Sequence, residues 1–194
     1  MAQNHELYDD ITYISGVILS DELKSHENNP YTWINTIYIK TLQHKKGDIG
    51  ETLFLLTFAT LQFRTMPLEL PLIGDTVHMP LPRPTDSLFF KRNNAIPQKF
   101  PYHFFTSKNE KDKYSHFFGN AFLAFNVRIF NLSKFMGIFV EYFEDAFKVE
   151  GAVDSKDLSV NQLGEVFGVL LRDNPDLMPS EILESLEFIF SLKF

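Results

Sequence analysis

The groups best suited to chemistry lie between residues 112 and 168, in the C-terminal half of the chain. Asp112 and His116 are four residues apart, one turn apart on the same face of a helix predicted to begin near residue 108. A histidine in this position can be oriented by the aspartate as a base or as a metal ligand. The pair therefore indicates a candidate site, although a packing histidine hydrogen-bonded to Asp112 has the same pattern.

Two glutamates follow on a second predicted helix, residues 133–147. Glu141 and Glu144 are three residues apart, and like charges this close repel unless a cation or a hydrogen-bond donor lies between them. A set of one histidine and several carboxylates, without thiols, suits a divalent ion such as Mg²⁺, Mn²⁺ or Zn²⁺. The sequence therefore predicts His116, Glu141, Glu144 and Asp157 as metal ligands, and Asp112, His116 and Glu141 as catalytic groups.

Other interpretations of these groups stay open at this point. The carboxylates and His116 could transfer protons without a metal, with a desolvated glutamate holding its proton near neutral pH. Glu141 and Glu144 could equally lie on a solvated helix face. No short motif fixes the metal, and the sequence contains no signature of a zinc protease, a phosphate-binding loop, an α/β-hydrolase nucleophile or a dinucleotide site.

A third helix, residues 155–171, is predicted to bring further polar groups to the same place. Asp157, Asn161, Gly164 and Gly168 fall on one stripe of this helix, at steps of four, three and four. A glycine inside a helix costs roughly 1 kcal/mol relative to alanine, so two of them indicate that another helix packs very closely there. Such packing would carry Asp157 and Asn161 into a shared interior, where Asn161 could orient a carboxylate.

Short motifs occur in a fixed order along these three helices: Asp-Lys-x-x-His-Phe, then Glu-x-x-Glu, then Ser-Lys-Asp-Leu followed by an asparagine and spaced glycines. This order resembles the VanZ-like proteins and the YfiM-type small envelope lipoproteins, over roughly a third of the chain. The resemblance implies an envelope protein and a candidate site, with little mechanism. The residues that carry it are Asp112, Lys113, His116, Phe117, Glu141, Glu144, Ser155, Lys156, Asp157, Leu158, Asn161, Gly164 and Gly168.

The chain departs from the VanZ-like proteins in one respect that bears on the membrane. VanZ-like members span the membrane, whereas here Arg128, Lys134 and Glu141 interrupt the apolar runs. The longest apolar run in this region, Ala121 to Phe125, is far short of the roughly 18 residues needed to cross a bilayer. We therefore expect no transmembrane span.

The composition narrows the classes of partner. The net charge is −7, and residues 141–194 hold 12 Asp and Glu against 4 Lys and Arg. Nucleic acid is not expected as a partner, because its phosphates require Lys and Arg for neutralisation. The chain has no cysteine, which excludes disulfides and thiolate catalysis. Its 21 Phe imply an aromatic-rich core or an apolar surface for a protein partner, a membrane surface or a lipid-linked substrate.

The remaining residues predict an α+β fold in a single domain, residues 1–194. Residues 1–65 are predicted to be strand-rich, because 11–19 and 33–41 hold β-branched and aromatic residues that suit a pleated sheet. Residues 52–63 could be a strand or a buried helix, and strand is favoured. The fold predicted is an N-terminal antiparallel sheet, a proline-rich extended connection over 66–106 with an edge strand within 68–79, and a bundle of about four helices over 107–194, the last of them at 181–192.

Two functions follow from this organisation. The first is an envelope-related protein with a buried His/carboxylate site, acting as a metal-assisted hydrolase of a lipid-linked or amphipathic substrate. The second is a non-catalytic structural, partner-binding or lipid-binding protein, in which the same residues form a hydrogen-bond network that specifies helix packing. The first ten residues lack the basic and apolar regions of a signal peptide. The location therefore stays open: the resemblance implies the envelope or periplasm if the N-terminus has been trimmed, and otherwise the cytoplasm is expected.

Overall fold

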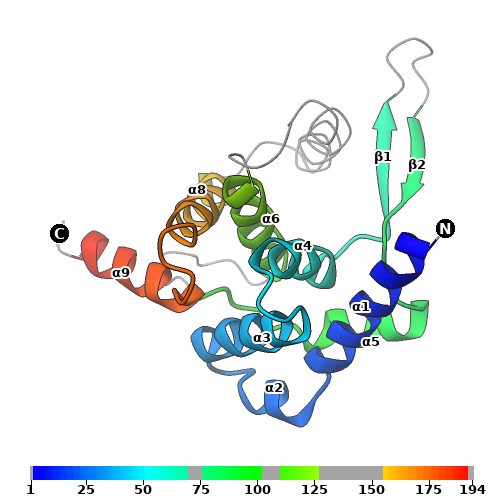
Figure 1. Ribbon diagram of the computed structural model, residues 1–194, viewed down its shortest axis with the longest axis horizontal. Helices are drawn as coiled ribbons and strands as arrows, with labels where there is room; N and C mark the ends of the chain where they lie inside the picture. Colours follow the sequence, from blue (N-terminus) through cyan, green and yellow to red (C-terminus); the bar gives the residue numbers. More distant parts are fainter. Residues whose placement is uncertain (1, 70–75, 102–109, 127–154, 192–194) are drawn as a thin grey trace.

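The chain forms a predominantly helical body with one small hairpin standing away from it (Figure 1). In this computed structural model the described residues are 2–69, 76–101, 110–126 and 155–191. Within them, the description of 2–5, 66–69, 76–77, 155–158 and 186–191 extends to the backbone only. The described helices are α1 (Ala2–Ile18), α2 (Asp21–Ser25), α3 (Pro30–His44), α4 (Ile49–Thr60), α5 (Asp86–Ala95), α6 (Asp112–Asn126), α8 (Ser155–Leu170) and α9 (Pro179–Ser191).

The predicted N-terminal antiparallel sheet is wrong, because all three predicted strands are helices. Residues 11–19 belong to α1, 33–41 to α3, and most of 52–63 to α4. In α3 the buried residues recur at helical spacing and turn one face to the core. They are Trp33, Ile34, Ile37, Tyr38 and Thr41.

The threonines that favoured a strand are accommodated by bonding back into their own helices. Thr41 donates to the Ile37 carbonyl at 2.8 Å, and Thr57 donates to the Leu53 carbonyl at 2.8 Å. Each hydroxyl thereby donates to a carbonyl one turn earlier, so it can be buried in a helix without losing its hydrogen bond. Local β-propensity was overridden by the burial of these faces.

Helix caps fix the residues at which α3 begins and ends. Asn29 accepts from the Thr32 N–H at 3.1 Å, with Pro30 at the first position of α3. Between α3 and α4, Lys46 and Gly47 adopt φ values of 55° and 87°. Glycine suits this left-handed region, and the Gly47 N–H donates to the Leu42 carbonyl at 2.8 Å, which ends α3.

The proline-rich connection is more ordered than predicted. Strands β1 (Thr65–Glu69) and β2 (Thr76–Pro80) pair antiparallel, with Pro67 opposite His78. This hairpin agrees with the edge strand predicted within 68–79. Helix α5 was not predicted and fits between two prolines, at positions 84 and 97, that lie outside its ends.

The predicted C-terminal helices are confirmed where they are described. Helix α6 begins at Asp112, four residues later than expected, α8 begins at Ser155, and α9 spans Pro179–Ser191. Asn35 of α3 joins α9 to the body: it donates to the Ser180 hydroxyl at 2.7 Å and accepts from the Ser180 N–H at 3.0 Å. The helix predicted at 133–147 lies outside the described residues.

The core is rich in aromatic rings, as the phenylalanine content suggested. Phe117 of α6 stacks on Phe167 of α8, with ring centres 5.3 Å apart, and lies 5.9 Å from Phe100. Trp33 meets Tyr114 edge-on at 4.9 Å. Helix α4 lies in the middle of the body and packs on α1, α3 and α6 (Figure 1).

Candidate functional site

Helices α6 and α8 pack side by side in the same direction, with almost no gap between their backbones. A Cβ atom added to Gly164 would collide with the Phe117 carbonyl, and one added to Gly168 would collide with the Ala121 carbonyl. One turn further along, the Arg172 Nε atom donates to the Phe125 carbonyl at 3.0 Å. In each of these three contacts the residue of the second segment comes 47 positions after its partner on α6. The two helices are therefore parallel. The close packing predicted from the glycines is confirmed.

A small hydrogen-bond network of side chains lies at the start of this contact. The Asn161 Oδ1 atom of α8 accepts from Asn120 Nδ2 at 2.9 Å and lies 3.1 Å from His116 Nδ1. An amide oxygen only accepts, so the imidazole donates from Nδ1. Asn120 also donates to the His116 carbonyl at 2.9 Å. His116 is 6% exposed, and the network therefore joins the two helices inside the protein.

The structure places the predicted site residues in different surroundings. His116 contacts Asn161, which was expected to orient a carboxylate. The Asp112 carboxylate pairs with Lys113 at 3.2 Å. The Nδ1 atom of His116 is oriented by Asn161. Asp157 lies on the first turn of α8, where only the backbone is described.

Glu141 and Glu144 lie outside the described residues, so half of the predicted metal set has no described position. Among the residues that are described, no group of three or more His, Asp and Glu side chains could hold a metal ion. Binding of Mg²⁺, Mn²⁺ or Zn²⁺ by His116, Glu141, Glu144 and Asp157 stays a prediction.

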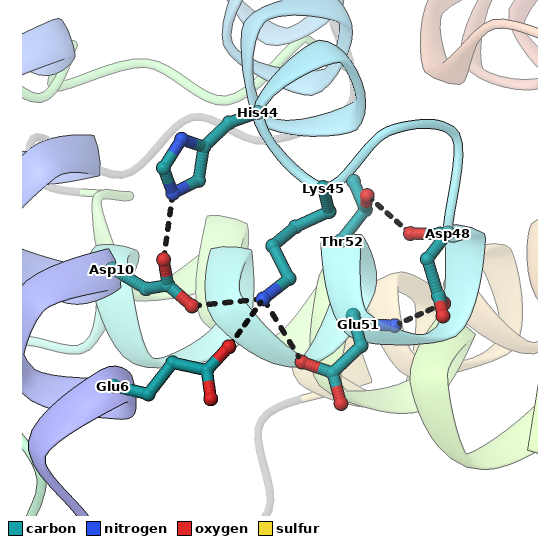
Figure 2. Close-up of polar contacts among 7 residues, drawn as sticks. All are labelled: Glu6, Asp10, His44, Lys45, Asp48, Glu51 and Thr52. Carbon is teal, nitrogen blue, oxygen red and sulfur yellow. Dashed lines mark hydrogen bonds and ion pairs between the residues drawn. The ribbon is translucent and has the colours of Figure 1, made fainter. Parts of the chain in front are cut away.

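A second polar cluster, not predicted from the sequence, joins α1, α3 and α4 (Figure 2). Lys45 Nζ lies 2.9 Å from Asp10, 3.6 Å from Glu51 and 3.9 Å from Glu6. The other Asp10 oxygen lies 2.6 Å from His44 Nε2. The His44 ring stacks on Tyr13, with centres 4.1 Å apart.

The charges of this cluster hold one another in their ionised forms. Burial raises the pKa of Asp10, but the hydrogen bonds to Lys45 and His44 and the charges of these two residues together lower it by more. The pKa of Asp10 is therefore below its ordinary value. Burial lowers the pKa of Lys45, and the bond to Asp10 with the neighbouring carboxylates raises it more. The Asp10 and Lys45 side chains are 13% and 15% exposed. The cluster therefore acts as an ionic clamp between helices.

A third buried polar group, the Arg92 side chain, caps the C-terminal end of α4. The Arg92 guanidinium of α5 is fully buried and donates to three carbonyls at the end of α4: Phe58 at 3.0 Å, Leu61 at 2.7 Å, and Ala59. Its plane lies over the Phe89 ring, 4.7 Å from the centre. Burial lowers the pKa of Arg92 to about 9, but the carbonyls are aligned with the negative end of the helix dipole and favour the cation.

One open cleft lies on the far side of α1 from the ionic clamp. It has a volume of about 420 Å³ and lies between Tyr8 and Thr12 of α1 and residues 80–86. Arg83 on its wall is paired with Asp86, which leaves no unpaired charge aimed into the cleft from these two residues. The cleft therefore offers shape and apolar surface more than chemistry.

Sequence reasoning missed the ionic clamp and the Arg92 cap for the same reason. Asp10 and His44 are 34 residues apart, and Arg92 and Phe58 are also 34 apart, so no local spacing connects them. The only local signal was Asp48 before an apolar helix, which is a cap pattern.

Comparisons with known proteins identify no family for this chain. No protein-family model, no curated protein and no solved structure matches the chain. The resemblance to the VanZ-like and YfiM-type proteins therefore stays a prediction. Among the described residues, no helix is both long and apolar enough to cross a membrane.

Proposed function

We propose that this chain is a non-catalytic helical protein that works by binding, and that His116, Asn120 and Asn161 form the hydrogen-bond network that specifies how α6 packs on α8. The observation that carries the proposal is the Asn161 amide oxygen, which lies within hydrogen-bond distance of a donor on each of two side chains of the other helix. A buried amide satisfied in this way stabilises one arrangement of the helices over others.

The position of the network supports this role. Asn161 is followed by Gly164 and Gly168, at which the backbones of the two helices touch. Apolar contacts would tolerate a small rotation or slide of one helix, whereas the hydrogen bonds would be lost by it, because they require donor–acceptor distances near 3 Å. The glycines set the distance between the helices, and the network sets their register.

Metal-assisted hydrolysis of a lipid-linked or amphipathic substrate is the competing hypothesis. It requires Glu141 and Glu144 to meet His116. The two hypotheses differ in what His116 does for stability, because removing a catalytic group often leaves a protein as stable or more stable. Removing one partner of a buried hydrogen bond instead costs about 1–3 kcal/mol.

We therefore predict that His116→Leu lowers the free energy of unfolding by about 1–3 kcal/mol. The matched control is His116→Asn, whose amide can donate from nearly the position of the imidazole Nδ1 atom, and it should lose less than half as much. Urea unfolding followed by circular dichroism measures both. Equal losses in the two variants, or no loss in either, would contradict a role for the hydrogen bond.

An ion series completes the test. The midpoint of thermal unfolding is measured with EDTA and then with Mg²⁺, Mn²⁺ and Zn²⁺ in turn, for the natural chain, His116→Leu and Glu141→Gln. We expect no ion to raise the midpoint. A rise with one ion that disappears in both variants would overturn the proposal and support the metal hypothesis.

A further inference from the structure

The outer face of α8 carries an apolar stripe that the described structure leaves uncovered. Val166, Val169 and Leu170 are 44%, 46% and 42% exposed, at spacings of three and one. On the same helix Leu163 and Phe167 are buried in the core. Exposed apolar residues at i, i+3 and i+4 form the pattern by which one helix anchors on another.

The exposed charged side chains nearest to this stripe in the sequence are acidic. Glu165 lies beside the stripe and Asp173 lies one turn beyond it, and both are exposed. Arg172, the cation nearest to them in the sequence, donates from Nε to the Phe125 carbonyl of α6. Over residues 159–185 every exposed charged side chain is acidic: Glu165, Asp173, Asp176, Glu181 and Glu184.

We propose that the outer face of α8, centred on Val166, Val169 and Leu170, docks a basic amphipathic helix of a partner protein. An apolar centre with acidic flanks is complementary to apolar anchors flanked by Lys and Arg. The inference rests on the proposed function, because the glycine contacts and the Asn161 network hold the inner face of α8 on α6. Figure 1 shows α8 beside α6 at the outer edge of the helical body.

The same charges argue against a second copy of the chain on this face. A two-fold interface brings the same patch of both copies together, so Glu165 and Asp173 would meet the equivalent carboxylates of the other molecule. Like charges brought together disfavour association, whereas Lys and Arg on a partner would be attracted and would bind faster at low salt.

The test uses two synthetic helical peptides with identical leucine anchors, one flanked by Lys and the other by Glu. Binding of each labelled peptide to the full chain is measured by fluorescence anisotropy, at low and at high salt. The Lys peptide should bind at least about tenfold more tightly than the Glu peptide, and high salt should reduce this difference.

Variants of the chain locate the binding. Val169→Gln and Glu165→Gln should each weaken binding of the Lys peptide by about tenfold or less, with no change in the unfolding midpoint of the chain. The control is Ile39→Gln on α3, an apolar residue that is 36% exposed on another helix, and it should leave the affinity unchanged.

Three results would overturn the proposal. Equal binding of both peptides would show that charge complementarity does not contribute to binding. Self-association of the natural chain that is lost in Val169→Gln would identify a second copy as the occupant. A lower unfolding midpoint in Val169→Gln would mean that another part of the chain covers the face. Failure of the proposed function would instead appear in the His116 variants and the ion series, with the peptide affinities unaffected.

Discussion

The two ends of α4 are held by opposite charges in very different surroundings. At the N-terminus, Asp48 accepts from the Glu51 N–H at 2.9 Å, and Lys45 joins this end to Asp10 (Figure 2). At the C-terminus, the Arg92 guanidinium is buried on backbone carbonyls. Asp48 and Arg92 both agree with the dipole of α4, which favours anions at the N-terminus and cations at the C-terminus.

The difference between the ends lies in what would replace each contact. At the N-terminal end, Lys45 keeps two exposed carboxylate partners, Glu6 and Glu51, if its pair with Asp10 is broken. Arg92 has no exposed surface, and the carbonyls it binds would be left without a donor. Stability should therefore depend strongly on the C-terminal end of α4 and weakly on the N-terminal end.

Removal of the buried cation should have the largest effect. Arg92→Met should lower the free energy of unfolding by about 2–4 kcal/mol, because several carbonyls lose a charged donor. Arg92→Lys is the matched control, which keeps the charge but cannot reach three carbonyls at once. It should lie between Arg92→Met and the natural chain in urea unfolding. A loss below about 0.5 kcal/mol for Arg92→Met would mean that the two ends do not differ.

Loss of the N-terminal cap should have a smaller effect. Asp48→Ala should cost about 1 kcal/mol, since the Glu51 N–H loses its acceptor. Asp48→Asn keeps an acceptor oxygen but removes the charge, so it separates the cap from the dipole and should cost a few tenths of a kcal/mol. The same urea unfolding experiment measures both variants. If Asp48→Asn costs as much as Asp48→Ala, the charge matters more than the hydrogen bond.

The ionic clamp should contribute least, and in a way that depends on pH. Because the pKa of Asp10 is lowered in the folded state, its contribution is present above the unfolded value of 3.8 and is lost as the pH falls through the folded pKa. Asp10→Asn should cost only about 0.5–1 kcal/mol at pH 7, because Lys45 keeps Glu6 and Glu51 as partners in the variant. Below pH 3.8 the difference from the natural chain should shrink, and at pH 7 about 1 M salt should also reduce it.

The pH series has its own control. Asp9 lies next to Asp10 in the sequence and is exposed, so Asp9→Asn should leave the pH profile of stability close to that of the natural chain. A profile for Asp10→Asn that runs parallel to the natural one down to acid pH would show that the clamp contributes no pH-dependent stability.

The sequence allowed parts of the α6–α8 junction to be predicted because its signals are local. Asn161, Gly164 and Gly168 share a stripe by spacing alone, and two glycines in one helix face have few explanations other than close packing. The contact between His116 and Asn161 was not predicted, because Asn161 was expected to orient a carboxylate. The role of Asp112 could not be judged in this way, because its neighbour Lys113 competes for the carboxylate.

The N-terminal half was predicted wrongly because local propensity and tertiary burial disagree there. Trp33, Ile37 and Thr41 suit a strand by residue type, but their spacing buries one face of a helix. Thr57 and Thr60 lose their β-preference once their hydroxyls bond to the carbonyls one turn earlier.

By itself, the sequence determined features that act within one turn of a helix. The glycine stripe of α8 was predicted in this way, and the caps at Asn29 and Asp48 are of the same local kind although they were not predicted. Only the tertiary structure decided that Lys45 meets Asp10 and that Arg92 ends α4. The physical reason is that caps and stripes arise from the geometry of a single helix, whereas a buried charge is stabilised by whichever distant groups the packing brings to it.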